Sequence, residues 1–442
     1  MSAFVCAGAL AGPAVLAAGA PAAAQPGTSA PAQVRADDIG GRLEGIPGMT
    51  VTKVEEVQGH PLYALAYRQP VDHDDPGAGT FTQRLTLWHK ATDRPTVLFT
   101  SGYALTSDTH PLTGILDANQ ISVEHRYFGA SRPTGAAGED WSKLTVQQEA
   151  ADEHRLTRAL RTLEKGKWIG TGSSKGGMTV TYHERFYPKD LDGVVAIVAP
   201  NDTPAQGDRG YRRFFETVGT KECRDALNAV QREMLVRRDA LLPRFEAQAK
   251  AEGATFEETL GSADRAYEYG VLDQVWGFWQ LSRAEDCARV PDAKKASDDE
   301  LYSWSMENGM YMERDENVES RPYNRQAATQ LGWADLTFDR LDGLLRYPGL
   351  RRPNSLLPAA MRGSYDGRTV ADVDRWVRTK GERMLFLYGE NDPWSAERFT
   401  PSRHDSHLFV APGANHATPV DDLPPEQLGQ MVAIVKRWAD VT

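Results

Sequence analysis

The segment Trp-Ile-Gly-Thr-Gly-Ser-Ser-Lys-Gly-Gly, residues 168–177, decides the fold of this 442-residue chain. It begins as a short apolar strand and continues through a serine into a predicted helix, residues 176–188. Gly172 and Gly176 lie two residues before and two residues after Ser174, which gives the pattern G-x-S-x-G. In so tight a turn the flanking residues must lack a Cβ that would collide with the neighbouring strand and helix. The pattern therefore predicts a nucleophilic serine whose Oγ is raised above a sheet.

A dinucleotide-binding loop is the alternative interpretation of the same segment, because Gly170 and Gly172 follow the strand. The third glycine of that pattern would fall at position 175, which is a lysine. The next predicted strand ends in Ala199 and Pro200, where a dinucleotide site needs an acidic residue. The nucleophile turn is the better interpretation.

Strand-like and helix-like segments alternate around this turn. The predicted strands are residues 49–57, 63–71, 81–90, 95–102, 120–127, 168–172, 191–200, 384–390 and 408–414. The predicted helices are residues 145–165, 176–188, 221–252, 256–285, 297–312, 323–333, 370–380 and 424–440. Thr145 is predicted to cap the first helix in a capping box with Gln148. Apolar strands that alternate with helices predict a mostly parallel central sheet covered on both faces.

An acid and a histidine follow the serine in the chain order that a hydrolase sheet of this kind requires. Asp392 comes directly after the strand at 384–390, at the strand end where open α/β sheets carry catalytic groups, and Glu390 is a second possible acid. His416 is the histidine that follows the acid after one further strand. We therefore predict an α/β-hydrolase fold with Ser174, Asp392 and His416 as the catalytic triad.

The predicted roles follow from acyl-transfer chemistry. His416 takes the proton of Ser174 during attack and returns it to the leaving group, while Asp392 fixes the imidazole tautomer. Two backbone N–H groups are needed for the oxyanion, and we assign them to Lys175 and Tyr103. The side chain of Lys175 is expected to be a solvated surface charge.

A block without predicted strands, residues 203–370, interrupts the sheet. We interpret it as a helical cap inserted between two parts of the hydrolase domain, residues 46–202 and 371–442. Aromatic walls suit a peptide that contains a flat prolyl ring. The aromatic residues of the cap selected as substrate contacts are Trp276, Trp279 and Trp304. Packing in the core of the cap is the alternative for each of them.

The N-terminal residues 1–24 are almost entirely small and apolar and end in three alanines, which predicts a signal peptide and its cleavage site. The usual basic start is missing, since the first cation is Arg35. Residues 25–45 are rich in Pro, Ala and Gly and are interpreted as a flexible lead-in or short pro-segment. For residues 1–24, the alternative to a signal peptide is a disordered tail or a membrane anchor. We expect a secreted protein without stable membrane association once the signal is removed.

Composition and cysteine content narrow the possible partners. The net charge is −11 and no basic run occurs, which argues against nucleic acid as a binding partner. Loss of Cys6 with the signal leaves Cys223 and Cys287, and one disulfide between them is predicted in an exported protein, with two free thiols as the alternative. No Cys/His spacing indicates a metal site, and the chemistry predicted for the triad needs no cofactor.

Five motifs, in this order along the chain, resemble those of secreted proline-specific serine peptidases. They are VDHDD at 71–75, FTQRLTLWHK at 81–90, EHRYFGAS at 124–131, LTVQQEAADE at 144–153 and GTGSSKGGMT at 170–179. The likeness covers about residues 45–440 and is strongest to the actinobacterial tripeptidyl aminopeptidases of peptidase family S37. It extends more distantly to the Pro-Xaa carboxypeptidase and dipeptidyl-peptidase II group, family S28, which shares the EHRYxG-type strand.

The resemblance implies an exopeptidase that removes tri- or tetrapeptides from free N-termini, prefers Pro at the cleaved bond and restricts access with its cap. An aminopeptidase must hold a cationic terminus, and a buried carboxylate can pair with it. Glu307, which resembles an acid in the cap of the related group, is the first candidate, and Asp202 beside the sheet is the second. Glu124 and Arg126 either pair near the site or belong to the scaffold.

Three other functions remain as alternatives. A carboxylesterase or lipase would share the fold, although the charged cap differs from an apolar lid. A non-catalytic binding protein would share it too, although all three triad residues are present. A carboxypeptidase would need a cation for the substrate carboxylate, and the cap contains several arginines.

Overall fold

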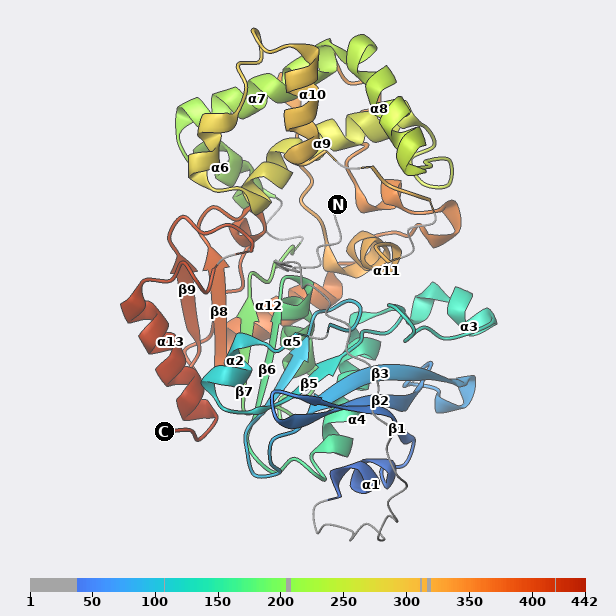
Figure 1. Cartoon of the computed structure of the whole chain (residues 1–442), viewed down its shortest axis with the longest axis vertical. Coiled ribbons are helices and arrows are strands. Elements are labelled where there is room, and N and C mark those ends of the chain that lie inside the picture. The colour runs from blue at the N-terminus through green and yellow to red at the C-terminus, as the bar shows by residue number, and fades with distance from the viewer. Residues whose placement is uncertain (1–37, 107, 204–207, 311, 316–318, 418) are drawn as a thin grey trace, which may run out of the picture.

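The computed structural model describes residues 38–442, apart from residues 107, 204–207, 311, 316–318 and 418. The predicted signal peptide and most of the predicted lead-in lie outside the described residues. No helix within the described ranges is long and apolar enough to cross a lipid bilayer. A sheet with flanking helices forms the lower part of the molecule and a helical layer forms the upper part (Figure 1).

The nine strands form one sheet in the order β1-β2-β3-β5-β4-β6-β7-β8-β9. Their bounds are Met49–Val57 (β1), His60–Pro70 (β2), Thr80–Trp88 (β3), Thr96–Thr100 (β4), Asn119–Val123 (β5), Trp168–Ser173 (β6), Gly193–Ile197 (β7), Met384–Gly389 (β8) and His407–Ala411 (β9). The β1–β2, β2–β3 and β3–β5 pairs are antiparallel, and every pair from β5 to β9 is parallel. This order and direction confirm the predicted α/β-hydrolase fold.

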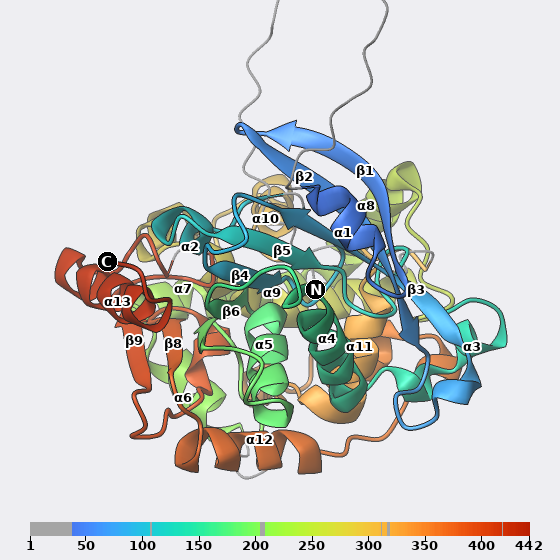
Figure 2. The same ribbon diagram turned by 90° about the horizontal axis from the view of Figure 1, so that it is seen from below.

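Helices cover both faces of the parallel strands (Figure 2). Leu98 of β4 packs in the cluster that includes residues of α4 (Val146–Leu160), α5 (Lys175–Phe186) and α12 (Arg368–Thr379). Its neighbour Val97 faces the other way, toward α2 (Pro111–Ile115) and α13 (Pro425–Trp438). Two-sided burial explains why these strands are continuous apolar runs, with about 1.5–3 kcal/mol gained for each large side chain buried. The small helices α1 (Ile39–Glu44) and α3 (Ala136–Glu139) lie near the antiparallel strands.

The start of α4 confirms one half of the predicted capping box. The Oγ1 atom of Thr145 accepts a hydrogen bond of 3.2 Å from the backbone N–H of Gln148. The Gln148 side chain does not return to Thr145; its amide donates to Asp72 and its oxygen accepts from the N–H of His73. The reciprocal bond predicted from the sequence is therefore wrong, because a distant loop competes for the glutamine.

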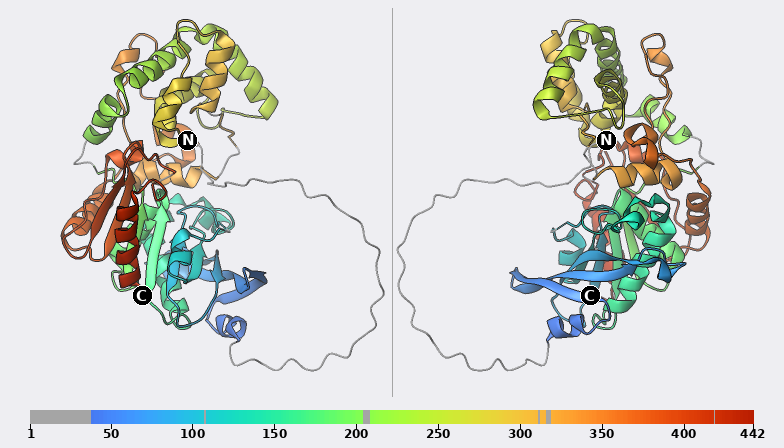
Figure 3. Two further views of the ribbon diagram at one scale, coloured as in Figure 1. Left: turned by 60° about the vertical axis from the view of Figure 1, so that its left-hand side comes forward. Right: turned by 90° about the vertical axis from the view of Figure 1, so that its right-hand side faces the viewer.

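Six α-helices of the described residues lie between β7 and α12 in the chain. They are α6 (Arg209–Thr217), α7 (Lys221–Val236), α8 (Arg238–Glu252), α9 (Ala263–Leu281), α10 (Asp298–Glu307) and α11 (Arg321–Gln326). The first five form a layer over the edge of the sheet, as both side views show (Figure 3). The single helix predicted at 221–252 is two helices, because the chain turns at Arg237.

The predicted disulfide between Cys223 and Cys287 is present, with 5.4 Å between the two Cα atoms. It joins the first turn of α7 to the short helix η3 (Ala284–Arg289) that follows α9, across 64 residues of sequence. In the chain-entropy account, closing a loop of this length stabilises the folded protein by about 4 kcal/mol. The disulfide therefore ties together the two ends of the α7–α9 part of the cap.

Candidate active site

Ser174 occupies a strained turn between β6 and α5. Its φ of 56° and ψ of −122° lie in a region that residues with a side chain rarely adopt, and its N–H donates to the carbonyl of Ile197 at 2.8 Å. A Cβ on Gly172 would lie 2.4 Å from the carbonyl carbon of Gly176, and one on Gly176 would lie 2.2 Å from the Thr100 oxygen. Both contacts are with backbone, so the two glycines are required by close approach of the chain. The turn has the geometry of a nucleophile elbow.

Asp392 and His416 are hydrogen-bonded to each other, with 2.9 Å between the Oδ2 and Nδ1 atoms. Asp392 is fully buried, and its carboxylate also accepts from the N–H of Trp394 at 3.0 Å and from the hydroxyl of Ser395 at 2.5 Å. These bonds hold the imidazole with Nε2 free for proton transfer. The alternative acid, Glu390, is exposed and caps a backbone N–H of the following loop instead.

The three predicted triad residues lie at one edge of the sheet, where the parallel strands β6, β8 and β9 end. Within the described part of the chain, the Oγ atom of Ser174 makes no hydrogen bond, so the bond to His416 is not formed in this structure. Such bonds are often long in ligand-free sites and shorten when substrate binds. The catalytic roles of the triad remain a prediction that this geometry allows.

The two N–H groups predicted for the oxyanion lie on adjacent segments. Lys175 begins α5, where the first backbone N–H groups have no partner within the helix. A Cβ on Gly102 would lie 2.8 Å from the nitrogen of Gly176, so the loop after β4 runs against the nucleophile turn. In this structure the N–H of Tyr103 donates to the Oγ atom of Ser101 at 3.0 Å. Tyr103 can serve the oxyanion only if this bond is exchanged when substrate binds.

The expectation of a solvated Lys175 side chain is wrong. The side chain is 2% exposed, and its ammonium donates to the carbonyl oxygen of Gly102 at 2.6 Å. It also lies 3.1 Å from Nε2 of His125, which in turn lies 2.8 Å from the carboxylate of Glu149. Burial lowers the pKa of Lys175 to about 8, although Glu149 and Glu153 oppose the shift. The lysine that follows the nucleophile therefore holds the predicted oxyanion loop from inside the protein.

Glu124 and Arg126 of the EHRYFGAS motif do not pair with each other. Glu124 accepts hydrogen bonds from Nη2 and Nε of Arg84 at 2.6 and 2.8 Å, and Asp152 of α4 accepts from Nε and Nη2 of Arg126 at 2.6 and 2.8 Å. These bidentate pairs connect the end of β5 to β3 and to α4. Of the two roles left open by the sequence, the structure supports the scaffold.

The candidate substrate residues of the cap do not meet at the triad. Trp276 is 2% exposed and packs on Trp394 with ring centroids 4.6 Å apart, and Trp279 is fully buried. Trp304 packs with other aromatic residues of the cap, and Glu307 is exposed at the end of α10. Because these helices turn their aromatic faces into the cap, core packing accounts for the tryptophans, and the structure does not support Glu307 as a buried partner for an amine.

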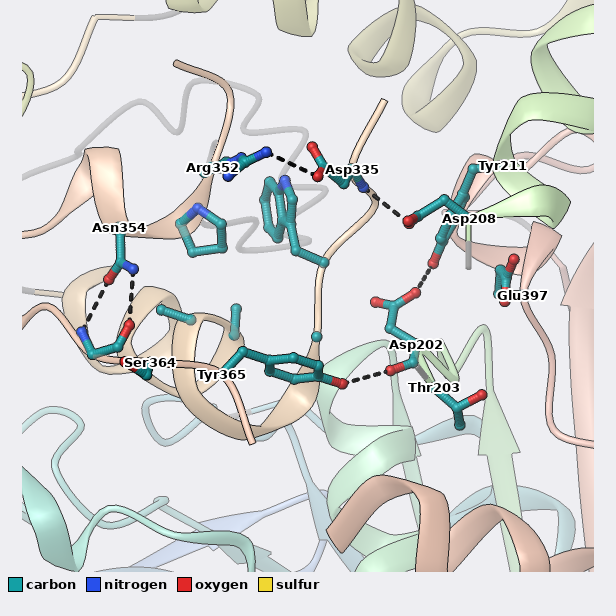
Figure 4. A pocket seen from close by; sticks show the side chains of 16 residues that line it. Asp202, Thr203, Asp208, Tyr211, Asp335, Arg352, Asn354, Ser364, Tyr365 and Glu397 are labelled. Carbon is teal, nitrogen blue, oxygen red and sulfur yellow. Dashed lines mark hydrogen bonds and ion pairs between the residues drawn. The ribbon is translucent and has the colours of Figure 1, made fainter. Parts of the chain in front are cut away.

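Asp202 lines a cavity of about 530 Å³ between the sheet and the cap (Figure 4). Its carboxylate accepts a short hydrogen bond from the hydroxyl of Tyr211, and its backbone carbonyl accepts one of 3.0 Å from Tyr365. The pKa of Asp202 is raised to about 7, mainly by burial and also by like-charge repulsion from Glu397 and Asp208, although the hydrogen bond from Tyr211 opposes the shift. The cavity contains three further acids, Asp208, Asp335 and Glu397, that sequence reasoning missed because they come from different parts of the chain.

The strained serine, the buried Asp392–His416 pair and the topology of the sheet together define a serine hydrolase of the α/β-hydrolase fold. The chain matches the family described as PS-10 peptidase S37 over residues 32–442. It belongs to this family, which confirms the resemblance inferred from the motifs.

The chain is also similar to individual proteins. The chain is 48% identical to the prolyl tri/tetrapeptidyl aminopeptidase of Streptomyces mobaraensis, across 91% of this chain and 85% of that protein. It is 34% identical to the lysosomal Pro-X carboxypeptidase of Bos taurus across 19% of each chain. Among solved structures, the proline iminopeptidase of Mycobacterium smegmatis aligns at 13% identity and a TM-score of 0.39, over 85% of this chain and 98% of that one.

Proposed function

We propose that this protein is a secreted serine exopeptidase that releases tri- and tetrapeptides from the free N-termini of peptides, with Pro preferred at the cleaved bond. The observation that carries the proposal is the buried Asp392–His416 pair at the sheet edge that presents Ser174. It is supported by 48% identity, across 91% of the chain, to a prolyl tri/tetrapeptidyl aminopeptidase.

The proposed reaction proceeds through an acyl-enzyme. Ser174 attacks the carbonyl carbon of the scissile bond while Nε2 of His416 takes its proton, and Asp392 stabilises the imidazolium that forms. The N–H of Lys175 stabilises the tetrahedral oxyanion. The imidazolium then protonates the departing amine, and a water molecule activated by His416 releases the peptide from Ser174.

Contacts between the cap and the loop that carries His416 support restriction to chain ends. The N–H of His416 donates to the carbonyl of Gln280 at 3.1 Å, and Asn415 donates to the carbonyl of Leu281 at 2.7 Å. The C-terminal end of α9 thus lies directly against the histidine loop. Trp394 places an aromatic ring 6.5 Å from the His416 ring, which suits a prolyl side chain.

Secretion is part of the proposal. The predicted signal peptide is its main support, and the disulfide between Cys223 and Cys287 is a second, because such bonds persist in oxidising compartments. Expression of the full chain in an actinobacterial host, followed by N-terminal sequencing of the protein in the medium, tests export and gives the cleavage site. Retention of the uncleaved chain inside the cell would contradict it.

A substrate panel tests the activity. The wild-type enzyme is expected to hydrolyse the p-nitroanilide of Ala-Ala-Pro rapidly and that of Ala-Ala-Ala more slowly, whereas p-nitrophenyl butyrate should be a poor substrate. Ser174→Ala serves as the control for contaminating enzymes. Rapid ester hydrolysis without anilide hydrolysis would favour an esterase, and removal of residues from the C-termini of peptides would favour a carboxypeptidase.

A further inference from the structure

Three carboxylates, Asp202, Asp208 and Glu397, converge on one side of the cavity between the sheet and the cap (Figure 4). Among the described residues none of the three forms an ion pair with a lysine, arginine or histidine. A fourth acid of the same cavity, Asp335, behaves differently, because it pairs with Arg352 at 3.0 Å. The cavity therefore carries negative charge that the described part of the chain does not neutralise by direct pairing.

Glu397 gives an independent indication of a missing hydrogen-bond donor. Its side chain is 2% exposed, and one carboxylate oxygen accepts from the N–H of Gly210 at 2.8 Å. The other oxygen is buried and has no partner among the described residues. The hydroxyl of Thr203, which also lines the cavity, is buried without a partner in the same way. A buried carboxylate oxygen without a donor is costly, and a ligand that donates hydrogen bonds would satisfy it.

The nearest cations do not neutralise Glu397. Arg209 and Arg212 of α6 lower its pKa through their charge, and so does the bond from Gly210. Burial acts more strongly and the charge of Asp208 adds to it, so the pKa of Glu397 is raised overall. Burial raises the pKa of Asp208 too, in spite of Arg212. All the acids on this side of the cavity would thus be stabilised in their charged form by a bound cation.

Ring contacts connect the wall of the cavity to the predicted triad. Trp333 lines it and contacts Trp394 with ring centroids 5.6 Å apart, and Trp394 in turn lies 6.5 Å from the ring of His416. On the other side, Asp202 follows β7, whose last residue accepts a hydrogen bond from Ser174. Three residues of extended peptide span about 10 Å. A site for the first residue of a peptide whose third residue is attacked by Ser174 is needed at about this distance from the nucleophile.

We propose that this cavity binds the free α-ammonium group of the substrate through Glu397, Asp202 and Asp208, and so sets the number of residues removed. The proposal rests on the aminopeptidase function proposed above. An ammonium group has three N–H donors and no acceptor. It can donate to the unpartnered oxygen of Glu397 and to the second carboxylate oxygen of Asp202, and Asp208 adds a third negative charge. Charge-assisted bonds of this kind are stronger than those between neutral groups.

The experiment compares free and N-acetylated Ala-Ala-Pro p-nitroanilide on the wild-type enzyme and on Glu397→Gln, Asp202→Asn and Glu307→Gln. Wild-type kcat/KM is expected to be much higher for the free peptide. Glu397→Gln and Asp202→Asn should each reduce the ratio of the two kcat/KM values by about tenfold to a hundredfold, the effect of losing a charge-assisted bond. The value for the acetylated peptide should stay within about threefold, since its binding never used these charges.

Glu307→Gln is the matched control, because it removes one exposed acid of the cap and should leave the ratio unchanged. The rate at which a fluorophosphonate labels Ser174 shows whether each variant retains a folded catalytic site. If Glu397→Gln does not fold, Asp202→Asn, whose carboxylate is only partly buried, decides the question. N-acetylated Lys-Ala-Pro anilide tests whether a side-chain ammonium can replace the α-ammonium, and rapid turnover of it would show that the site does not select the terminus.

The outcomes separate the two proposals. A wild-type enzyme that cleaves free and acetylated peptides equally well would refute the aminopeptidase function itself. A wild-type preference that survives in Glu397→Gln and Asp202→Asn would refute only the cavity as the ammonium site. Loss of the preference in Glu307→Gln would return that role to the cap.

Discussion

The interior of the sheet domain and its junction with the cap both bury charged side chains, but they treat them differently. In the sheet domain, Arg126 is fully buried and is matched by Asp152, while buried Lys175 lies beside His125 and Glu149. At the junction, three acids of the cavity, Asp202, Asp208 and Glu397, form no ion pair among the described residues, although Asp335 of the same cavity pairs with Arg352. Paired buried charges hold a scaffold, whereas unpaired ones are costly unless a ligand completes them. The difference sets the three cavity acids apart from the paired charges at Arg126 and Lys175.

The largest expected effect is on the triad, at the boundary between the two regions. Ser174→Ala should lower kcat by about 10⁴-fold or more, and Asp392→Asn by a similar factor because the wrong imidazole tautomer is then stabilised. Anilide hydrolysis with active-site titration measures both. Neither substitution should change the urea concentration at half-unfolding greatly, and full activity of either variant would end the assignment.

Unfolding experiments test the comparison itself. Arg126→Met removes the bidentate partner of buried Asp152, which keeps only His73 at 2.7 Å, and should lower the free energy of unfolding by about 3–5 kcal/mol. Asp202→Asn should instead raise the free energy of unfolding at pH 8. The pKa of Asp202 is raised to about 7 in the folded protein, mainly by burial, so its ionised form opposes folding above that pH. This cost of ionising Asp202 disappears as the pH falls toward the pKa of an unfolded aspartate, near 4. Near that pH the wild-type protein and Asp202→Asn should therefore have the same free energy of unfolding.

Equal destabilisation by Arg126→Met and Asp202→Asn at pH 8, measured by urea unfolding, would show that the junction is scaffold as well. Glu307→Gln, an exposed acid of the cap, provides the reference for a substitution of similar size with little effect.

A third effect concerns the positioning of the oxyanion loop. Lys175→Met removes the ammonium that holds the carbonyl of Gly102, and this carbonyl belongs to the same planar peptide group as the N–H of Tyr103. If the N–H of Tyr103 exchanges its bond to Ser101 for the oxyanion when substrate binds, freeing that peptide should lower kcat by about a hundredfold, the usual loss for one oxyanion donor, with little change in KM.

Lys175→Arg, which keeps the charge, is the matched variant and should recover part of kcat. A merely structural lysine would instead show a lower unfolding midpoint with kcat per labelled Ser174 unchanged, and that result would remove Lys175 from the reaction.

The sequence predicts the sheet domain much better than the junction, for physical reasons. The bounds of β1 agree residue for residue with the prediction, and the triad follows from chain order, because strand periodicity and strand ends are local properties. The direction of the Lys175 side chain is not local. It depends on a loop more than seventy residues earlier, which supplies the carbonyl of Gly102.

The cavity was harder still to foresee. Asp202, Asp208 and Glu397 lie on segments that meet only in the folded protein, and most acids of any chain are solvated. For the acid of the triad, by contrast, a local signal was available in the Pro-Trp-Ser that follows Asp392. Trp394 and Ser395 of that segment donate hydrogen bonds to the Asp392 carboxylate. The cap tryptophans were misjudged because aromatic content alone does not tell which helix face is turned inward.

The smallest effect is one of pH, and it belongs to the junction alone. Below its pKa of about 7, Asp202 is protonated and cannot pair with an ammonium group, which itself remains charged below about pH 8. The groups that face it are the hydroxyls of Tyr211 and Tyr365 and the acids Asp208 and Glu397, whose pKa values burial also raises. The ratio of kcat/KM for free over acetylated peptide should fall by about tenfold from pH 7.5 to 5.5. Titration of His416 affects both substrates equally and cancels in the ratio, so a ratio that stays flat would show that these acids do not bind the terminus.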